Sequence, residues 1–320
     1  MAVQDLVTKS NQDMDNSAVT SIDFRVFLLG SQFKPGLLRQ LMVYGLLIVL
    51  AALFLLPFYW MVNTALKPSN QVFRVPPTWF PKPVMWSNFY KAMTMRGTEA
   101  RVSSSAPPVY KYALNTTLIT VNGVVGTLMS SSMVAYAFAR LKFPGQNVFF
   151  VGILSTLMIP FAVVMVPQFI IWKNLNWLDT LWPLMVPHWF GSAWNIFLLR
   201  QFFMTIPVDY DEAALMDGAS RWDIYWRIIM PLSRPALAAV AVFAFVYFWN
   251  DFLGPLIILS TPENFTLTIY LVNFTVAFWQ VTPWHLYMAA ALIITLPCLI
   301  LFFFSQRAFL KGITITGFKR

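Results

Sequence analysis

Long apolar runs separated by short polar segments dominate this chain. A helix needs about 20 mainly apolar residues to cross the hydrocarbon core of a bilayer. Six segments meet this requirement, at about 41–63, 113–138, 148–172, 183–203, 235–259 and 285–306. The fourth is the weakest, because His188, Gly191 and Asn195 interrupt it. The pattern predicts an all-α polytopic membrane protein with six transmembrane helices.

Composition supports a membrane environment. The 320 residues are 58% hydrophobic and 11% charged, whereas soluble domains average about 25% charged residues. The net charge of +9 is compatible with nucleic-acid binding. However, the basic residues flank the apolar segments, as expected when positive charge is retained on the cytoplasmic side of a membrane. We therefore expect a lipid bilayer as the environment and no nucleic-acid partner.

The distribution of basic residues predicts that both termini face the cytoplasm. The last outer segment, about 260–284, contains no lysine or arginine. The first outer segment, about 64–112, contains several, but long segments are largely exempt from the charge rule. This segment is rich in proline and aromatic residues, which predicts a folded extracytoplasmic cap. We divide the chain into a cytoplasmic N-terminal tail, 1–37, and a membrane domain, 38–320.

A charged stretch at about 200–234 interrupts the apolar pattern between the fourth and fifth spans. Acidic residues from Asp209 onward suit the N-terminus of a short helix, and Gly218 suits its end, where the left-handed conformation is common. Ser220–Asp223 has the pattern of a capping box that begins a second helix, and Pro231 limits that helix. The predicted topology places this helix–glycine–helix unit in the cytoplasm.

The sequence contains no arrangement typical of an enzyme or a metal site. The phosphate-binding pattern Gly-x-x-x-x-Gly-Lys-Ser/Thr is absent from the chain, so ATP is not bound in that manner. His188 and His285 fall at the outer ends of predicted spans without ligand spacing, and the single cysteine, Cys298, lies in an apolar run. We predict no catalytic residues, no metal and no cofactor held by this chain itself.

One polar group lies deep within a predicted span. Asp251 follows Trp249 and Asn250 and precedes Phe252, and a carboxylate inside a bilayer faces a cavity or a partner because its insertion is costly. One interpretation is a substrate path, with Trp249 and Phe252 as apolar surfaces for a sugar ring. The alternative is an interhelical hydrogen bond or a position near the outer headgroups, and the sequence leaves both open.

The charged stretch resembles the cytoplasmic signature of binding-protein-dependent ABC importer permeases. Glu212-Ala213-Ala214, three residues, Gly218, nine residues, Ile228, one residue and Met230-Pro231 follow the family pattern, except that the family has leucine where this chain has Met230. Three further stretches resemble the maltose-type carbohydrate branch: Leu66-Lys67 with Pro76–Trp79, Trp249-Asn250 with Phe252 and Pro255-Leu256, and Arg307–Gly312. The resemblance covers about residues 38–320.

The resemblance implies a type I ABC importer permease that works in a larger assembly. The implied partners are a second permease subunit, two ATP-binding cassette subunits that bind the ATP, and an extracytoplasmic sugar-binding protein. The first helix of the signature is then a coupling helix that docks on an ATPase subunit. The residues that the resemblance assigns to this coupling are Asp211, Glu212, Ala213, Ala214, Asp217, Gly218, Ile228 and Pro231.

The same resemblance implies the cell membrane of a bacterium or archaeon and a sugar as substrate. A neutral oligosaccharide is the family-level expectation, with a sugar phosphate, a polyol or an anionic sugar as alternatives. An ion-coupled secondary transporter would favour paired intramembrane acids and inverted repeats. A polytopic membrane enzyme would need a polar cluster at one membrane face. The sequence shows neither feature.

Overall fold

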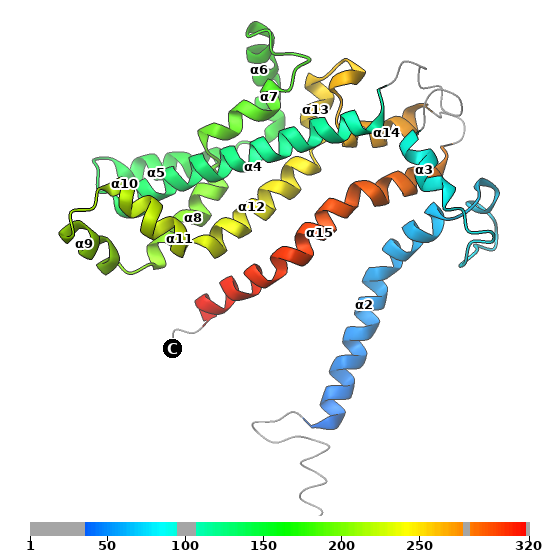
Figure 1. The fold of residues 1–320 in the computed structure, drawn as a ribbon, viewed down its shortest axis with the longest axis horizontal. Helices are drawn as coiled ribbons and strands as arrows, with labels where there is room; N and C mark the ends of the chain where they lie inside the picture. The colour runs from blue at the N-terminus through cyan, green and yellow to red at the C-terminus, as the bar shows by residue number, and fades with distance from the viewer. Residues whose placement is uncertain (1–35, 95–106, 278–281, 318–320) are drawn as a thin grey trace, which may run out of the picture. The chain divides into compact units, whose positions relative to one another are not determined.

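The computed structural model describes residues 36–94, 107–277 and 282–317, and for 274–277 and 307–317 it describes the backbone alone. The predicted N-terminal tail lies almost wholly outside the described residues. Within them the chain forms helices and no strand, as the apolar pattern predicts (Figure 1). The chain divides into two compact units, Met1–Asn63 and Thr64–Arg320.

The described part of the first unit consists almost wholly of α2 (Leu37–Ala65), whose last two residues belong to the second unit. Its side chains are apolar around the whole circumference and exposed along most of its length. A helix with this surface is typical of a membrane span, and α2 has a mean hydropathy of 2.6 over its most apolar window. It matches the first predicted span.

The second unit begins with short elements and one long helix. These are the 3-10 helix η1 (Ser69–Gln71), α3 (Ser87–Thr94) and α4 (Val109–Arg140). The bent middle follows: α5 (Gln146–Ser155), η2 (Thr156–Met158), α6 (Phe161–Asn174), α7 (Trp182–Met185), η3 (Val186–Phe190) and α8 (Ala193–Thr205). The remaining elements are α9 (Asp209–Met216), α10 (Arg221–Asp223), the π-helix η4 (Ile224–Ile229), α11 (Met230–Leu232), α12 (Arg234–Trp249), α13 (Leu253–Ile258), η5 (Pro262–Asn264), α14 (Leu267–Ala277) and α15 (Trp284–Gly317).

The described helices include three that are long and apolar enough to span a membrane: α2, α4 and α15 up to Gln306. Two bent pairs raise this number to five if each pair is one span: α5–η2 with α6, bent by 98°, and α10–α11 with α12, bent by 77°. The fourth predicted span, 183–203, is divided among α7, η3 and the 13 residues of α8. A count of six spans therefore stays a prediction.

Proline and glycine account for two of these breaks. Pro160 disfavours the helical conformation of the residue before it, and Ile159 is extended between η2 and α6, with ψ 113°. Gly191 has φ +91° between η3 and α8, a conformation that L side chains rarely adopt. Both residues interrupt apolar segments that would otherwise continue as helices.

Helix α4 lies at the centre of the second unit. It packs against α8, α12 and η3, while α12 packs against α15 and α15 against α3. Small and hydroxyl side chains allow this close approach, as is common between membrane helices. Thr120, Ser131 and Ser132 of α4 are fully buried, and the hydroxyl of Ser132 lies 2.7 Å from that of Tyr225.

The two ends of α4 carry different structures (Figure 1). Near its N-terminus, Asn115 donates hydrogen bonds from Nδ2 to the carbonyls of Glu263 and Phe265 at 2.9 and 3.0 Å. At its C-terminus, Arg140 forms an ion pair with Asp211 of α9. The charged stretch predicted as a helix–glycine–helix unit therefore lies at the opposite end of α4 from the loop that contains η5.

Candidate functional site: the α9 loop and a polar cavity

The charged stretch forms the helix–glycine–helix unit that its sequence predicts. Helix α9 has Asp209, Asp211 and Glu212 in its first turn, where acids interact favourably with the helix dipole. Gly218 has φ +81° and its amide donates to the Leu215 carbonyl at 3.1 Å. The left-handed glycine ends α9 and turns the chain into the second helix.

The second helix begins with the predicted capping box. The Asp223 amide donates to Ser220 Oγ at 3.2 Å, and the Ser220 amide donates to Asp223 Oδ2 at 3.1 Å. Hydrogen bonds from the Ser220 side chain and backbone hold the pKa of Asp223 below its usual value. The helix then widens into the π-helix η4 and ends one residue beyond Pro231.

The side chains of α9 separate into an outward and an inward set. Glu212, Ala213 and Asp217 are exposed, and Met216, at 88% exposure, extends the outward surface. Ala214 turns inward and packs against a buried core that includes Tyr136, Leu199, Phe203 and Tyr225. We call Glu212, Ala213, Met216 and Asp217 the α9 outer face; Asp209, Tyr210 and Leu215 of the same helix are exposed as well.

Asp211 belongs to the inward set. Its side chain is 4% exposed and its Oδ2 lies 3.8 Å from Nε of Arg140. Asp211 is therefore buried, whereas Glu212 and Asp217, with which the sequence groups it, are exposed. Ile228 is also partly buried against the core, whereas Pro231 is exposed.

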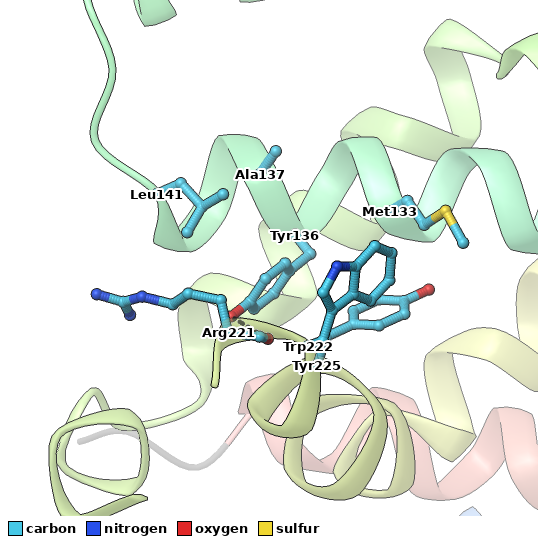
Figure 2. A pocket seen from close by; sticks show the side chains of 7 residues that line it. All are labelled: Met133, Tyr136, Ala137, Leu141, Arg221, Trp222 and Tyr225. Carbon is cyan, nitrogen blue, oxygen red and sulfur yellow. Dashed lines mark hydrogen bonds between the residues drawn. The ribbon is translucent and has the colours of Figure 1, made fainter. Parts of the chain in front are cut away.

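A cavity of about 380 Å³ lies between α4 and the start of the second helix. Figure 2 shows its lining: Met133, Tyr136, Ala137, Leu141, Arg221, Trp222 and Tyr225. The Tyr136 hydroxyl donates to the Arg221 carbonyl at 3.2 Å, which ties the second helix to α4. The exposed lining is mainly apolar, so the cavity offers little that would recognise a polar solute.

A second cavity, of about 460 Å³, lies among α4, η3, α8 and α12. We call it the central cavity, and it is lined by Thr127, His188, Ser192, Trp194, Asn195, Phe243, Ala244, Tyr247 and Phe248. These residues combine neutral hydrogen-bonding groups with aromatic rings and include no lysine, arginine or carboxylate. The Oδ1 atom of Asn195 is buried and has no hydrogen-bond partner among the described residues.

The residues predicted for a substrate path lie just beyond this cavity, at the C-terminal end of α12. Trp249 is 7% exposed and its Nε1 donates to the Ile294 carbonyl of α15 at 2.9 Å. Asn250 donates to the Val246 carbonyl, and Asp251 Oδ1 accepts from the Gly254 amide at 3.3 Å. Phe252 packs against a small apolar cluster. The buried indole of Trp249 fits a packing contact between α12 and α15.

Sequence reasoning missed the central cavity and Arg140. The sequence marks His188, Gly191 and Asn195 as interruptions of a weak span and His188 also as a histidine without ligand spacing, although polar residues within a span are themselves a sign of a cavity. Arg140 is one of the basic residues whose distribution predicts the topology, and the sequence indicates no other role for it. Among the described residues, no group of three or more His, Cys, Asp or Glu side chains is arranged to hold a metal ion.

Comparison with known proteins places these features in a wider group. A sequence model of the family described as "Binding-protein-dependent transport system inner membrane component" matches residues 126–315. The sn-glycerol-3-phosphate transport system permease protein UgpE of Yersinia pestis bv. Antiqua is 34% identical over 268 residues, 84% of this chain and 93% of that protein.

Two further relatives are each 30% identical. The diacetylchitobiose uptake system permease protein DasC of Streptomyces coelicolor aligns over 82% of this chain and 91% of its own length. The arabinooligosaccharides transport system permease protein AraQ of Bacillus subtilis aligns over 85% and 92%. In three dimensions, a chain of a bacterial ABC transporter involved in the import of the acidic polysaccharide alginate superposes with a TM-score of 0.70, at 23% identity, over 84% of this chain and 97% of that one.

Proposed function

Because this chain belongs to the family of binding-protein-dependent transport system inner membrane components, we propose that it forms half of the translocation path of an ATP-driven sugar importer. The relatives are permease components of ABC importers and not enzymes themselves. Membership of the family makes this chain a multi-pass membrane protein that works with an ATPase and a substrate-binding protein.

The α9 outer face is the surface by which we propose the chain docks an ATPase subunit. The observation that carries this proposal is the division of α9: Ala214 and Asp211 fasten the helix to its own fold, while Glu212, Ala213 and Asp217 stay exposed. Ala213 allows a partner to approach the backbone closely, and Glu212 can accept hydrogen bonds or pair with a basic residue. Gly218 fixes the turn that presents this face.

The ATP is bound and hydrolysed by the partner subunits in this proposal. A ligand changes a conformational equilibrium only through its different affinity for the two states. ATP-driven closure of the ATPase pair would move α9, and the spans would change from inward-open to outward-open. The assembly would then contain a second permease subunit, two ATPase subunits and an extracytoplasmic sugar-binding protein in the cell membrane of a bacterium or archaeon.

The central cavity supports a neutral sugar as the transported solute. Hydroxyls of Thr127, Ser192 and Tyr247 and the amide of Asn195 can hydrogen-bond sugar hydroxyls, and the exposed ring of Trp194 offers an apolar face. A buried polar atom such as Asn195 Oδ1 needs a hydrogen-bond partner, which a solute or a water would supply. A sugar phosphate is the alternative suggested by the glycerol-phosphate relative, but its charge would require a cation that the lining of this cavity lacks.

Purification with partners tests the proposal. The chain is co-expressed with its proposed partners: a second permease subunit, an ATPase subunit and a sugar-binding protein. ATP hydrolysis is then measured with the binding protein loaded with diacetylchitobiose, an arabino-oligosaccharide or glycerol 3-phosphate. We expect co-purification of an ATPase and stimulation by a neutral sugar. Glu212→Lys should abolish co-purification, whereas Asp209→Asn, on an exposed position of the same helix, should not. Normal ATPase binding and uptake by Glu212→Lys would contradict docking through α9.

A further inference from the structure

Arg140 occupies the C-terminal end of α4 and contacts two other elements. Its Nη2 donates to the carbonyls of Phe203 and Ile206, at 2.9 and 2.7 Å, and these carbonyls lie at the end of α8. Its Nε lies 3.8 Å from Oδ2 of Asp211 in the first turn of α9. Both side chains of this ion pair are about 95% buried. One guanidinium therefore joins α4, α8 and α9.

A second arginine connects the same two helices, but here the donor lies on α8 and the acceptor on α4. Arg200 of α8 donates from Nε to the Phe138 carbonyl of α4 at 3.2 Å, and its guanidinium lies 4.2 Å from the centre of the Phe150 ring. Arg140 and Arg200 therefore connect the ends of α4 and α8 through hydrogen bonds to backbone carbonyls, and these bonds do not involve α9. The ion pair between Arg140 and Asp211 is not needed to connect α4 with α8, so its role requires a separate explanation.

Stability alone is a poor explanation for Asp211. Buried ion pairs are often no more stabilising than apolar side chains of similar volume, because both charges lose their hydration. This pair is not closely hydrogen-bonded: Asp211 Oδ1 and Arg140 Nε are buried and have no hydrogen-bond partner within the described part of the chain. An ion pair does attach α9 to α4 at one defined point, whereas apolar packing of α9 would not.

Two of the three helices joined by Arg140, α4 and α8, also line the central cavity. Thr127 of α4 and Trp194 and Asn195 of α8 belong to its lining. Thr127 lies 13 residues before Arg140, which corresponds to about 20 Å along a helix. A rigid helix can transmit a displacement over this distance. A movement of α9 that pulls on Arg140 would thus reach the cavity through α4.

We propose that Asp211 and Arg140 form the joint through which α9 transmits its movement to α4 and so to the central cavity. The proposal rests on the proposed function, in which a partner ATPase moves α9. It assigns different roles to two neighbouring acids. Glu212 on the α9 outer face binds the partner, and Asp211 on the inner face is a positioning residue that carries the displacement inward.

A cysteine reporter at Thr127 tests the joint without knowledge of the substrate. The native cysteine is replaced by Cys298→Ser, Thr127→Cys is added, and the chain is purified with its ATPase partner. A maleimide then labels the reporter with and without ATP and orthovanadate. We expect a large ATP-dependent change in labelling rate in the parent protein. Asp211→Asn should retain ATPase co-purification and hydrolysis but reduce this change about 5-fold or more, the lower range of energetic coupling between sites.

Two further variants separate coupling from folding. Asp209→Asn removes the same charge from an exposed position of α9 and should label like the parent. Arg140→Met with Asp211→Leu removes both buried charges together, so neither is left unpaired, and this protein should assemble yet lose the ATP-dependent change. A parent-like change in either Asp211 variant would overturn the proposal. If both Asp211 variants lose assembly together with the ATP-dependent change in labelling, the proposal is overturned as well, because the ion pair then has a structural role only.

Failure of the proposed Asp211–Arg140 joint can be distinguished from failure of ATPase docking through α9. If the parent protein does not co-purify with an ATPase, or if Glu212→Lys still does, docking through α9 is wrong irrespective of Asp211. If docking holds and the Asp211 variants keep a full ATP-dependent change at Thr127→Cys, only the joint is wrong.

Discussion

The ring of Phe248 in α12 lies directly over Gly123 in α4. A Cβ added to Gly123 would stand 2.6 Å from Cε2 of Phe248 and 2.7 Å from Cδ2, closer than non-bonded carbon atoms approach. Phe248 is itself nearly buried and its ring lies 4.3 Å from that of His188. One missing side chain thus sets the distance between two helices that line the central cavity.

We expect Gly123→Val to destabilise the protein. The ring of Phe248 cannot move freely, and overpacking of a well-packed core costs about 1–3 kcal/mol. Thermal unfolding in detergent measures the effect. Gly152→Val in α5 is the matched control, because a Cβ there meets nothing within 4 Å. Combining Gly123→Val with Phe248→Ala should cost less than the sum of the single changes, and strict additivity would contradict the contact.

We expect Gly218→Val to weaken ATPase binding and Gly218→Asn to preserve it. A β-branched residue is strained at φ +81°, by about 1–2 kcal/mol for a left-handed conformation, whereas asparagine tolerates this region. A Cβ at Gly218 meets no atom within 4 Å, so the strain comes from the backbone alone. Co-purification with the ATPase measures the effect, and equal behaviour of the two variants would show that the turn geometry is not required.

We expect the stabilising contribution of Asp179 to disappear in acid. Asp179 Oδ1 accepts from the amides of Ser260 and Thr261, each at 2.9 Å. Burial raises the pKa of Asp179, but the hydrogen bonds from Thr261, Ser260 and Asn264 outweigh it and leave the pKa below its ordinary value of 3.8. A lowered pKa stabilises the folded state above the unfolded pKa, and this stabilisation is lost as the pH falls through the folded value.

Thermal unfolding of the wild type and of Asp179→Asn at two pH values measures this contribution. The wild type should have the higher Tm near pH 7, and the difference should shrink at about pH 3. A difference that grows on acidification would show that the carboxylate is not held in its ionised form by these hydrogen bonds.

We expect Asp251→Ala and Asn195→Leu to affect transport differently. Asn195→Leu removes a buried polar atom that has no hydrogen-bond partner within the described residues, and it should lower the rate of sugar uptake with assembly intact. Asp251→Ala tests the path predicted from the sequence, and there we expect an altered uptake rate or specificity, again with assembly intact. An unchanged uptake profile for Asp251→Ala would indicate that its carboxylate has a structural role, as the acceptor of a hydrogen bond from the Gly254 amide.

The all-helical membrane character, the helix–glycine–helix unit and the family can all be predicted from the amino-acid sequence. These depend on local physics: an apolar run must be long enough to cross a bilayer, a glycine permits the left-handed turn, and a serine caps a helix from three residues away. Each of these requirements is met by residues that are close together in the chain, so spacing alone reveals them.

Which side chains of the charged stretch face inward cannot be predicted from the sequence and becomes clear only from the three-dimensional structure. Asp211 and Glu212 are adjacent acids, and the sequence assigns both to docking, yet Asp211 pairs with Arg140, 71 positions earlier in the chain. The central cavity likewise combines residues of α4, η3, α8 and α12. Such contacts depend on how close two helices can pack, and the absence of a side chain at Gly123 becomes meaningful only once Phe248 is placed against it.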